Sequence, residues 1–399
     1  MTDNPAERPA VTLLPGHQKR ALRGHPWIFS NELQMDAAAK ALAPGSLVTL
    51  KTGDGRALGV ATFNPHTLVA ARLFDRDAGR RIDRDFFAKR LRRALAIRER
   101  LYGEPYYRLI HAEADGIAGA VVDRFGEIAV AQLNTAGMTR LEGELLAALE
   151  AVLAPRAIVL RNDSSARAQE GLGEEVRVAR GRLDGAVEVR ENGARFEVDL
   201  LGGQKTGWFY DQRDNRRFMA RLAKAARVLD LYCFVGGFAV EAAVAGAAAV
   251  TGIDRSEPAL ALATRSAALN GVSERCQFRR GEVFAELQTL ASAGERFDLV
   301  IADPPAFVKS KKDLGPGLRG YRKLARLAAA VAAPQGYLYL ASCSHNVSPE
   351  DFWEAVRRGL EDASRNARLL LSAGAAPDHP VHPHLPESAY LKGLVLALD

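Results

Sequence analysis

Short apolar stretches separated by glycine and proline mark the beginning of the chain. Four of them lie between residues 11 and 75, with the sequences VTLLPG, GSLVTLKT, RALGVATFNP and LVAARLFD. Apolar runs of this length, bounded by turn-forming residues, are typical of β-strands. The sequence TGDG at 52–55 is a turn signal between two of these runs. The pattern predicts a small β-barrel or sheet over residues 1–77.

A different period begins after residue 80. The apolar residues of RIDRDFFAKRLRRALAIRERL recur at helical spacing with arginine on the opposite face, which predicts one long amphipathic helix. Beyond it, GIAGAVVDRFGEIAVAQL indicates a hairpin, and a helix over 139–153 and a strand at AIVLRND are expected to follow. We therefore predict an α+β middle domain over residues 78–194.

Strands alternate with helices from residue 195 onwards. The predicted strands are ARVLDLYC, AAVTGID, CQFRRG, FDLVIADPP and GYLYLASCS, and helices are expected near 237–246, 257–270, 283–291 and 319–332. RLLLSAG and YLKGLVLAL are interpreted as two further strands. Such alternation is typical of a doubly wound parallel sheet. The fold class is therefore α/β, with a Rossmann-like domain over residues 195–399.

The amino-acid composition indicates which class of protein the chain belongs to. The chain has 399 residues, 48% of them hydrophobic and 26% charged, which is ordinary for a soluble globular protein of more than one domain. The first ten residues lack an apolar region, and the most apolar stretch, FAVEAAVAGAAAVTGI, contains Glu241. Neither a secretion signal nor a membrane-spanning helix is indicated. We expect a cytoplasmic protein with no membrane partner.

Cysteine and charge narrow the picture further. Cys233, Cys276 and Cys343 lack the paired spacing of a zinc site or a disulfide framework, so no metal and no disulfide is expected. The net charge of +6 is unevenly placed, since residues 1–100 carry 18 Lys and Arg against 10 Asp and Glu. A basic region of this kind indicates either a polyanion partner or a solvated arginine-rich face. Both interpretations stay open on charge alone.

A turn between a strand and a helix, at DLYCFVGGFAVEAAVAG, suggests a nucleoside-type ligand. Gly236 and Gly237 let the backbone approach a ligand closely, and Asp254, which ends the next strand, is placed to accept the hydroxyl groups of a ribose. Asp230 precedes the glycines, where it would repel a pyrophosphate. It suits the ammonium of S-adenosylmethionine instead. Glu282, after the third strand, is placed to meet an adenine amino group or to cap the following helix.

Two candidate catalytic residues follow neighbouring strands. Asp303 opens DPPAF at the end of the fourth strand, and Cys343 lies in ASCSHN at the end of the fifth. Regular winding brings both to one crevice at the carboxyl edge of the sheet. A thiolate can add to carbon 6 of a pyrimidine and so activate carbon 5, while Asp303 hydrogen-bonds or protonates N3. The competing interpretation of Cys343 is a small buried apolar residue. Cys233, the alternative nucleophile, is interpreted as packing.

Several motifs together resemble a known family. They are GHPWIFSNEL, EADGIAGAVVDRFG, GQKTGWFYDQRDNR at 203–216, LDLYCFVGGF, DPPAF, SCS and DHPVHPHLPESAYLKG. With these the chain resembles, nearly end to end, the bacterial large-subunit ribosomal RNA cytosine-5 methyltransferases that pair an N-terminal PUA domain with a class I methyltransferase domain. The resemblance implies an RNA-binding PUA-like barrel, S-adenosylmethionine as cofactor and 23S ribosomal RNA as partner. A homodimer stays an open alternative to a monomer.

The resemblance also implies roles for individual residues. Cys343 is expected to be the nucleophile and Asp303 its partner. The residues expected around the cofactor are Asp230, Tyr232, Phe234, Gly236, Gly237, Asp254, Arg255, Glu282, Val283 and Asp303, together with Gln204, Lys205, Thr206, Tyr210, Asp211 and Arg213 of the segment 203–216, which is interpreted as closing over cofactor and target. Two positions depart from the family: Glu282 stands where Asp is common, and Ala325 where Asn is common.

RNA contacts are expected from two basic groups. Lys19, Arg20 and Arg23 lie close to Trp27 and form a basic strip with an aromatic ring that can stack on a base. The ring of Trp27 is equally suited to a place in the core. Lys309, Lys311 and Lys312 follow DPPAF and are expected to contact phosphates, or else to form a solvated loop. The target base is expected to leave its stack to reach Cys343.

Other functions stay open at this point. An RNA guanine N-methyltransferase would share DPPAF and need no thiol. An RNA-binding assembly factor with a degenerate methyltransferase domain would not bind S-adenosylmethionine. A nucleotide-dependent oxidoreductase is disfavoured by Asp230 and by the lack of a GxGxxG loop.

Overall fold

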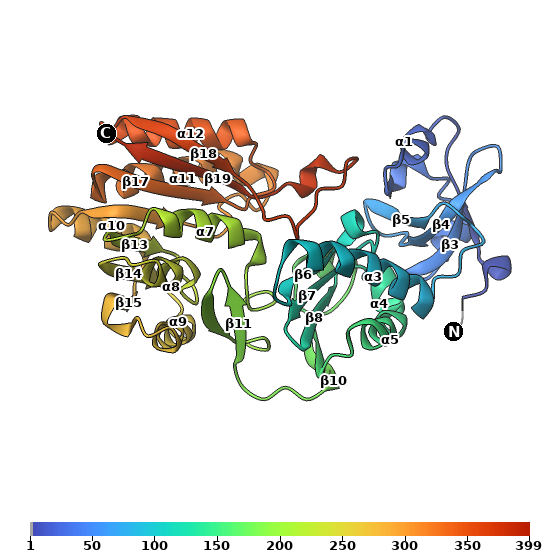
Figure 1. The fold of residues 1–399 in the computed structure, drawn as a ribbon. Helices are drawn as coiled ribbons and strands as arrows, with labels where there is room; N and C mark the ends of the chain where they lie inside the picture. Colours follow the sequence, from blue (N-terminus) through green and yellow to red (C-terminus); the bar gives the residue numbers. More distant parts are fainter. Residues whose placement is uncertain (1–2) are drawn as a thin grey trace. The chain divides into compact units, whose positions relative to one another are not determined.

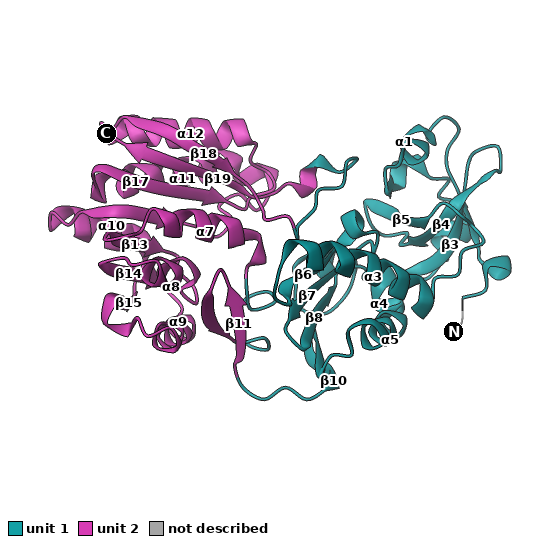
Figure 2. Ribbon diagram, in the orientation of Figure 1, with its two compact units in different colours: residues 1–185, 199–208, 378–386 teal, residues 186–198, 209–377, 387–399 magenta. Residues whose placement is uncertain are grey.

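Four β-sheets organise residues 3–399, the part of the chain that the computed structural model describes (Figure 1). The chain divides into two compact units (Figure 2). The first unit comprises the chain up to residue 185 together with residues 199–208 and 378–386. The second comprises residues 186–198, 209–377 and 387–399. None of the helices in residues 3–399 combines the length and the apolar character needed to cross a membrane.

The N-terminal part of the first unit is a five-stranded sheet with the order β1-β3-β4-β5-β2. Its strands are β1 (Ala10–Thr12), β2 (Trp27–Phe29), β3 (Ser46–Lys51), β4 (Ala57–Phe63) and β5 (Val69–Asp75); α1 (Lys19–Arg23), α2 (Ala37–Lys40) and the 3-10 turns η1 (Pro5–Glu7) and η2 (Ser30–Glu32) complete it. The apolar positions of the predicted strands, among them Val48, Leu50 and Ala61, are fully buried in its core. The predicted barrel or sheet is confirmed, including the turn at 52–55.

A second five-stranded sheet, β10-β9-β8-β7-β6, completes the first unit. It contains β6 (Tyr106–His111), β7 (Ala120–Phe125), β8 (Ile128–Leu133), β9 (Ala157–Asn162) and β10 (Glu175–Gly181), with α3 (Arg84–Leu101), η3 (Ala112–Asp115), α4 (Ala136–Arg140), α5 (Glu142–Leu153) and α6 (Ala166–Gln169). The predicted long helix begins at Arg84 because Asp83 caps it, accepting the N–H of Phe86 at 3.0 Å. The predicted hairpin is β7–β8. The helix expected over 139–153 is two helices, α4 and α5, which meet at Leu141.

The two predicted N-terminal domains form one compact unit because buried polar contacts join them. Glu170 follows α6 and is buried, yet its carboxylate accepts hydrogen bonds from Asn64 and Arg72, both of the barrel sheet. A buried carboxylate is stable only when it is paired in this way. The barrel sheet and the second sheet therefore share one interior. The predicted boundary after residue 77 stays a prediction.

The second unit is built on a seven-stranded sheet with the order β15-β14-β13-β16-β17-β19-β18. Its strands are β13 (Arg227–Leu231), β14 (Ala249–Asp254), β15 (Cys276–Arg280), β16 (Phe297–Ala302), β17 (Ala332–Ser342), β18 (Ala367–Ala373) and β19 (Lys392–Leu398). The five predicted alternating strands are parallel, and β19 runs antiparallel to β17 and β18. The doubly wound α/β fold is confirmed.

Helices connect and cover these strands. They are α7 (Arg213–Arg221), α8 (Gly237–Val244), α9 (Glu257–Leu269), α10 (Val283–Ser292), α11 (Leu314–Val331) and α12 (Pro349–Asp362), with short 3-10 turns η4 (Tyr210–Gln212), η5 (Ser273–Arg275), η6 (Lys311–Asp313) and η7 (Pro386–Ser388). Leu287, Leu324 and Phe352 of α10, α11 and α12 pack with the strands in one apolar cluster. A hairpin of β11 (Val187–Glu191) and β12 (Ala194–Val198) also belongs to this unit, so a boundary after residue 194 would fall inside β12.

The order of the strands places the candidate site. Successive strands β13, β14 and β15 extend in one direction, and β16 and β17 lie on the other side of β13, so the winding reverses between β13 and β16. Leu231 pairs with both Ile253 and Ala302, which means that these three strands end at the same edge of the sheet. Open α/β sheets bind ligands at the carboxyl edge beside such a reversal. The predicted cofactor and catalytic residues of this unit follow these strand ends.

Candidate active site

The turn from β13 into α8 has an unusual backbone. Tyr232 and Phe234 have positive φ angles of 61° and 50°, a region that costs energy for residues other than glycine. Gly236 also has a positive φ of 81°, and a Cβ there would lie 3.0 Å from the Cβ of Ala263. The turn is therefore held in a strained shape by its surroundings, directly before the first N–H groups of α8. Strain of this kind is common where the backbone binds a ligand.

Asp230 is the last residue but one of β13 and is 1% exposed. Its Oδ2 accepts the N–H of Ala239 at 3.0 Å, whereas Oδ1 is buried without a partner in residues 3–399. Burial raises the pKa of Asp230 well above its ordinary value, and the nearby carboxylates of Asp303 and Asp254 add to the rise. A buried acceptor with an empty position suits a cationic hydrogen-bond donor. The ammonium of S-adenosylmethionine fits this requirement, and a pyrophosphate does not.

Asp254 and Glu282 follow the next two strands and also hold the backbone. Asp254 accepts the N–H of Phe234 at 3.0 Å and the N–H of Ser256 at 2.8 Å, so it fixes the turn before α8 and the start of α9. Glu282 is exposed and caps α10, accepting the N–H of Ala285 through Oε2 at 2.9 Å. The capping interpretation of Glu282 therefore describes its contact.

Tyr232 lies between these acidic groups. The pKa of its hydroxyl is raised, first by burial and then by Glu282. Arg255 beside it is exposed, and Val283, at the start of α10, is buried. The turns after β13, β14 and β15 thus present an aromatic ring, two carboxylates and an apolar side chain at one edge. Ligand pockets in general combine apolar and aromatic side chains with a few polar groups in this way.

Cys343 and the DPP turn meet at the ends of β16 and β17. The Sγ of Cys343 lies 3.9 Å from the carbonyl oxygen of Pro304, within reach of a weak S–H hydrogen bond. Asp303, the residue before Pro304, is half-buried like Cys343, and its N–H approaches the carbonyl of Leu231 at 3.5 Å. The predicted neighbourhood of β16 and β17 is confirmed. The structure brings Cys343 and the DPP turn to one edge, as expected.

Hydrogen bonds with Tyr321 of α11 stabilise the turn that carries Cys343. The Tyr321 hydroxyl lies 2.8 Å from Ser342 Oγ and 2.9 Å from Ser344 Oγ, and Ser344 Oγ also accepts the N–H of Val308 at 3.2 Å. All of these groups are buried. The two serines therefore shape the turn rather than react. Sequence reasoning did not single out Tyr321, because a tyrosine in a helix gives no sign of the partner it reaches.

Lys392 is a second residue that sequence reasoning missed. It begins β19, pairs in register with Ser342 of β17 and is 8% exposed. Its Nζ donates to the carbonyls of Ser344 at 2.7 Å and Val347 at 3.0 Å. Burial lowers the pKa of the Lys392 ammonium. The available signal was a lysine inside the otherwise apolar run YLKGLVLAL.

The other two cysteines differ from Cys343 in their surroundings. Burial, followed by the charges of Asp230 and Asp254, raises the pKa of Cys233 well above its ordinary value. Burial also raises the pKa of Cys276 to about 11. Both thiols therefore stay protonated at neutral pH and are poor nucleophiles. This supports the interpretation of Cys233 as a packing residue.

The segment 203–216 is divided between the two units. Gln204, Lys205 and Thr206 belong to the first unit, where Thr206 is buried and Lys205 has a positive φ of 49°. Tyr210, Asp211 and Arg213 belong to the second. Asp211 accepts the hydroxyl of Tyr390 at 2.5 Å, and the ring of Tyr390 lies against that of His345, the residue two after Cys343. Arg213 lies over the ring of Tyr210 and 3.4 Å from the carboxylate of Glu191.

The predicted RNA-binding residues lie at two places. Lys19, Arg20 and Arg23 are exposed on α1, although Arg20 also contacts Glu32 at 3.2 Å. Trp27 is half-buried, and its indole N–H donates to Glu113 at 2.9 Å. Its ring is therefore tied to the second sheet of the first unit.

The second group lies on the loop that follows the DPPAF motif. Lys309, Lys311 and Lys312 are exposed after the DPPAF motif. The side chain of Asn346 donates to the carbonyl of Lys309 at 3.3 Å. This bond joins the lysine-bearing loop to the turn that carries Cys343.

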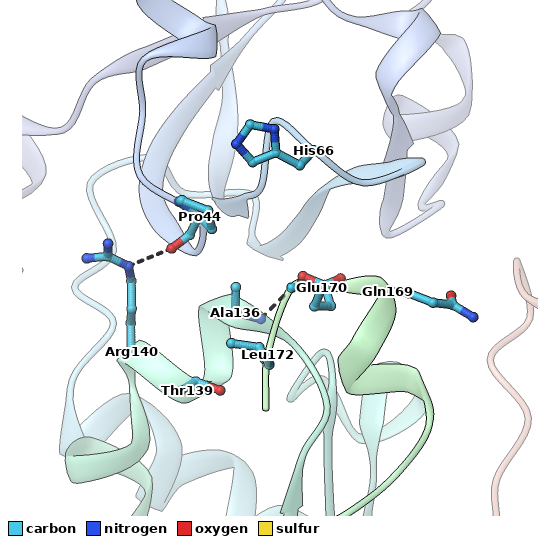
Figure 3. A pocket seen from close by; sticks show the side chains of 9 residues that line it. Pro44, His66, Ala136, Thr139, Arg140, Gln169, Glu170 and Leu172 are labelled. Atoms are coloured by element: carbon cyan, nitrogen blue, oxygen red, sulfur yellow. Dashed lines mark hydrogen bonds between the residues drawn. The ribbon is translucent and has the colours of Figure 1, made fainter. Parts of the chain in front are cut away.

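A cavity of about 570 Å³ lies elsewhere, in the first unit (Figure 3). It is lined by Pro44, His66, Ala136, Thr139, Arg140, Gln169, Glu170, Gly171 and Leu172. Arg140 donates to the carbonyl of Pro44 at 2.7 Å, and Glu170 accepts the N–H of Ala136 at 3.3 Å (Figure 3). Its most buried polar group, Glu170, is thus already paired. Within residues 3–399, no group of His, Cys, Asp and Glu side chains is arranged to hold a metal ion.

Comparison with solved structures confirms the fold. A Streptococcus mutans structure described as a SAM-dependent methyltransferase superposes with a TM-score of 0.82 at 20% identity, covering 98% of this chain and 100% of that one. A methyltransferase structure solved in complex with SAH gives the same TM-score and identity, with 98% and 99% coverage. At this level of identity the likeness concerns the fold of the whole chain.

Comparison with sequence families and curated relatives identifies the family. A model described as S-adenosylmethionine-dependent methyltransferase matches residues 168–397, and one described as PUA-like domain matches residues 11–76. Relatives from Pseudoalteromonas atlantica and Shewanella denitrificans, both named ribosomal RNA large subunit methyltransferase I, are 36% identical over 96% of this chain and 98% of their own length. The chain belongs to the ribosomal RNA large subunit methyltransferase I family of S-adenosylmethionine-dependent methyltransferases.

Proposed function

We propose that the protein methylates carbon 5 of a cytosine in 23S ribosomal RNA, with Cys343 as the covalent nucleophile. The observation that carries this proposal is the position of the Cys343 thiol, 3.9 Å from the carbonyl of Pro304 in the DPP turn and at the same sheet edge as Asp230. A methyltransferase acting on a nitrogen needs no thiol there. The names of the curated relatives supply the ribosomal RNA, and the thiol supports the choice of cytosine carbon 5.

Different side chains of the second unit are proposed to bind different parts of the cofactor. Oδ1 of Asp230 is proposed to accept the ammonium of the methionine part, and Asp254 the hydroxyl groups of the ribose. Glu282 and Val283 are proposed to contact the adenine through the free carboxylate oxygen and the apolar side chain. S-adenosylmethionine supplies the methyl group when it is bound.

The proposed reaction begins with the thiolate of Cys343. Its sulfur forms a bond to carbon 6 of the cytosine, and the electron pair of the carbon 5–carbon 6 double bond moves into the ring, which makes carbon 5 nucleophilic. Asp303 hydrogen-bonds or protonates N3 and so stabilises the charge that develops. After methyl transfer, carbon 5 loses its proton to water acting as a base. The carbon 6–sulfur bond then breaks and N3 returns to Asp303 any proton that it received, which restores the thiolate and the aromatic ring.

The basic residues are proposed to hold the RNA. Lys309, Lys311 and Lys312 are exposed beside the catalytic turn, where phosphates flanking the extruded base would pass. Lys19, Arg20 and Arg23 extend the contact to the PUA-like domain. The half-buried Trp27, whose N–H is bonded to Glu113, is proposed to stack on a base with its indole ring. A cytoplasmic location is proposed because all three cysteines are free thiols, which suits a reducing compartment.

A homodimer is also proposed, through the edge strand β18. Leu369 and Leu370 of this strand are 45% and 46% exposed, and β18 has only one neighbour in its sheet. An exposed apolar edge strand can pair with a second copy of itself. Replacement of Leu369 by lysine is expected to yield a monomer in analytical ultracentrifugation. An unchanged sedimentation coefficient would remove this interface.

The nucleophile is tested with Cys343→Ala and Cys343→Ser. Both variants are expected to bind S-adenosylmethionine as the wild type does and to lose methyl transfer to ribosomal RNA by at least about a thousandfold. RNA carrying 5-fluorocytosine is expected to form a covalent complex with the wild type and none with either variant. Full methylation by Cys343→Ala would contradict the covalent step and favour methylation of a guanine nitrogen, which mass mapping of the product nucleoside would identify.

A further inference from the structure

Lys392 is a buried cation in the second unit that the proposed reaction does not use. Its side chain reaches under the turn after β17, and Nζ donates to the carbonyls of Ser344 and Val347 at 2.7 and 3.0 Å. These carbonyls belong to the residue that follows Cys343 and to the end of the same turn. Two neutral acceptors occupy two of the three donors of the ammonium.

No carboxylate neutralises this ammonium. Lys392 has no Asp or Glu within ion-pair distance among residues 3–399, and the ionisable group that acts on it electrostatically is Cys343, whose negative charge raises the pKa of Lys392 against the effect of burial. A buried charge is costly unless it is paired. The missing negative charge is available one residue away from Ser344, as the thiolate of Cys343.

We propose that Lys392 is a positioning residue that stabilises Cys343 as the thiolate, so that the turn after β17 contains an ion pair only when the nucleophile is ready to react. The inference rests on the proposed function, in which that thiolate attacks the base. It assigns to Lys392 a role besides holding the turn. Ionisable cysteines elsewhere are activated by neighbouring cations in the same way.

Other groups around the thiol could also influence its ionisation. They are the carboxylate of Asp303 in the DPP turn, the hydroxyl of Tyr321 in α11, the imidazole of His345 in the turn itself and the ammonium of Lys309 in the adjoining loop. Asp303 opposes thiolate formation through its negative charge, and Tyr321 is neutral at physiological pH because burial raises its pKa. Lys309 and His345 are exposed to solvent, which screens their charges. Lys392 is the buried cation of this set.

The test measures the ionisation of Cys343 in the purified full-length protein without RNA. The rate of alkylation of Cys343 by iodoacetamide is followed against pH by mass spectrometry of the peptide that contains it. Lys392→Gln keeps N–H donors for the two carbonyls and removes the charge. The midpoint of the alkylation profile is expected to rise by about one pH unit or more, so that alkylation at neutral pH slows roughly tenfold. Lys392→Arg keeps the charge and is expected to stay near the wild-type midpoint.

Tyr321→Phe is the control for loosening of the turn. It removes the hydroxyl between Ser342 and Ser344 and leaves Lys392 in place, so its midpoint is expected to move much less than that of Lys392→Gln. A wild-type midpoint in Lys392→Gln would overturn the proposal. Equal shifts of the alkylation midpoint in Lys392→Gln and Lys392→Arg, or in Lys392→Gln and Tyr321→Phe, would also overturn it. Lys392 would then only hold the turn in place.

Thermal melting would reveal whether Lys392→Gln fails to fold. In that case a second measurement, which does not use this variant, tests the proposal. The ultraviolet absorbance of the thiolate is titrated in the wild type against Cys343→Ser. A midpoint clearly below the ordinary cysteine value of about 8.5 is expected, and one at or above it would contradict the proposal. Because neither measurement uses RNA, the thiolate result stands even if Cys343→Ala were to retain methylation. That outcome would remove the covalent reaction alone.

Discussion

Asp230 Oδ2 accepts the backbone N–H of Ala239 at 3.0 Å, while Oδ1 of the same carboxylate is buried without a donor in the described part of the chain. One carboxylate thus ties β13 to α8 and keeps a position open for a ligand. Asp230→Asn is expected to preserve the bond to Ala239 and to lose the charge. The affinity for S-adenosylmethionine, measured by calorimetry, should fall about ten- to hundredfold, since a hydrogen bond to a charged group contributes roughly 1.5–3 kcal/mol.

The same substitution is expected to stabilise the protein without ligand. Folding raises the pKa of Asp230, so its contribution to stability is present at low pH and is lost as pH rises above the unfolded value of about 3.9. At neutral pH the buried charge is therefore destabilising, and Asp230→Asn should melt at a higher temperature. Asp298→Asn, at an exposed carboxylate of the same sheet, is the matched control and should change neither property. A lower melting temperature of Asp230→Asn would contradict this account.

The capping role of Glu282 and its proposed role in binding S-adenosylmethionine can be tested separately. Glu282→Ser keeps a good N-cap for α10 and removes the carboxylate, so the melting temperature should stay near that of the wild type while the affinity for S-adenosylmethionine falls about tenfold. Glu282→Ala should lose affinity and also about 1 kcal/mol of stability. If Glu282→Ser binds the cofactor as tightly as the wild type, the residue is a cap only.

The hydroxyl of Tyr321 should contribute to both stability and turnover. Tyr321→Phe leaves Ser342 and Ser344 with one buried partner fewer, which is expected to lower the free energy of unfolding by about 1–3 kcal/mol and to slow methyl transfer. Chemical denaturation gives the first quantity and single-turnover kinetics the second. Tyr337→Phe, the same change on β17 away from the turn, should be close to neutral. Equal effects of the two substitutions would show that the hydroxyl of Tyr321 is not special.

The remaining cysteines are expected to be dispensable for chemistry. With a pKa of about 11, fewer than about one in a thousand Cys276 thiols is ionised at neutral pH, and burial also raises the pKa of Cys233 well above its ordinary value. A Cys233→Ala, Cys276→Ser double variant should therefore keep wild-type methylation and wild-type sensitivity to iodoacetamide. Loss of that sensitivity in the double variant would mean that the reactive thiol is not Cys343.

The residues at the carboxyl edge of the sheet could be predicted from the sequence, whereas the residues that support the turn after β17 could not. Asp230, Asp254, Asp303 and Cys343 each end an apolar run, and the alternation of strands and helices brings such ends together. Tyr321 and Lys392 contact the turn that carries Cys343, one from a helix and the other from an antiparallel strand. Their partners lie 23 and 48 residues away in the chain, so no local pattern could show these contacts.

Two other differences arise from where a segment lies in the fold. β10 has mixed polar and apolar residues because it is an exposed edge strand, so its sequence lacks the apolar run on which prediction relies. The segment 203–216 reads as one polar and aromatic loop, yet its halves belong to different compact units. Composition cannot show such a division, because it depends on which part of the chain each half packs against.

The lysines after DPPAF provide a final prediction, on RNA affinity. Lys309, Lys311 and Lys312 are exposed, and the bond from Asn346 to the carbonyl of Lys309 keeps their loop beside the turn that carries Cys343. The triple alanine variant should bind ribosomal RNA fragments more weakly, and a plot of log affinity against log salt concentration should become shallower by about two to three units, because each phosphate contact releases counterions. Affinity for S-adenosylmethionine should not change, since none of the three lysines is among the residues proposed to contact the cofactor. Lys224→Ala, at an exposed lysine after α7, is the control and should leave the slope as it is. An unchanged slope in the triple variant would mean that the loop is solvated and that the phosphates are held elsewhere.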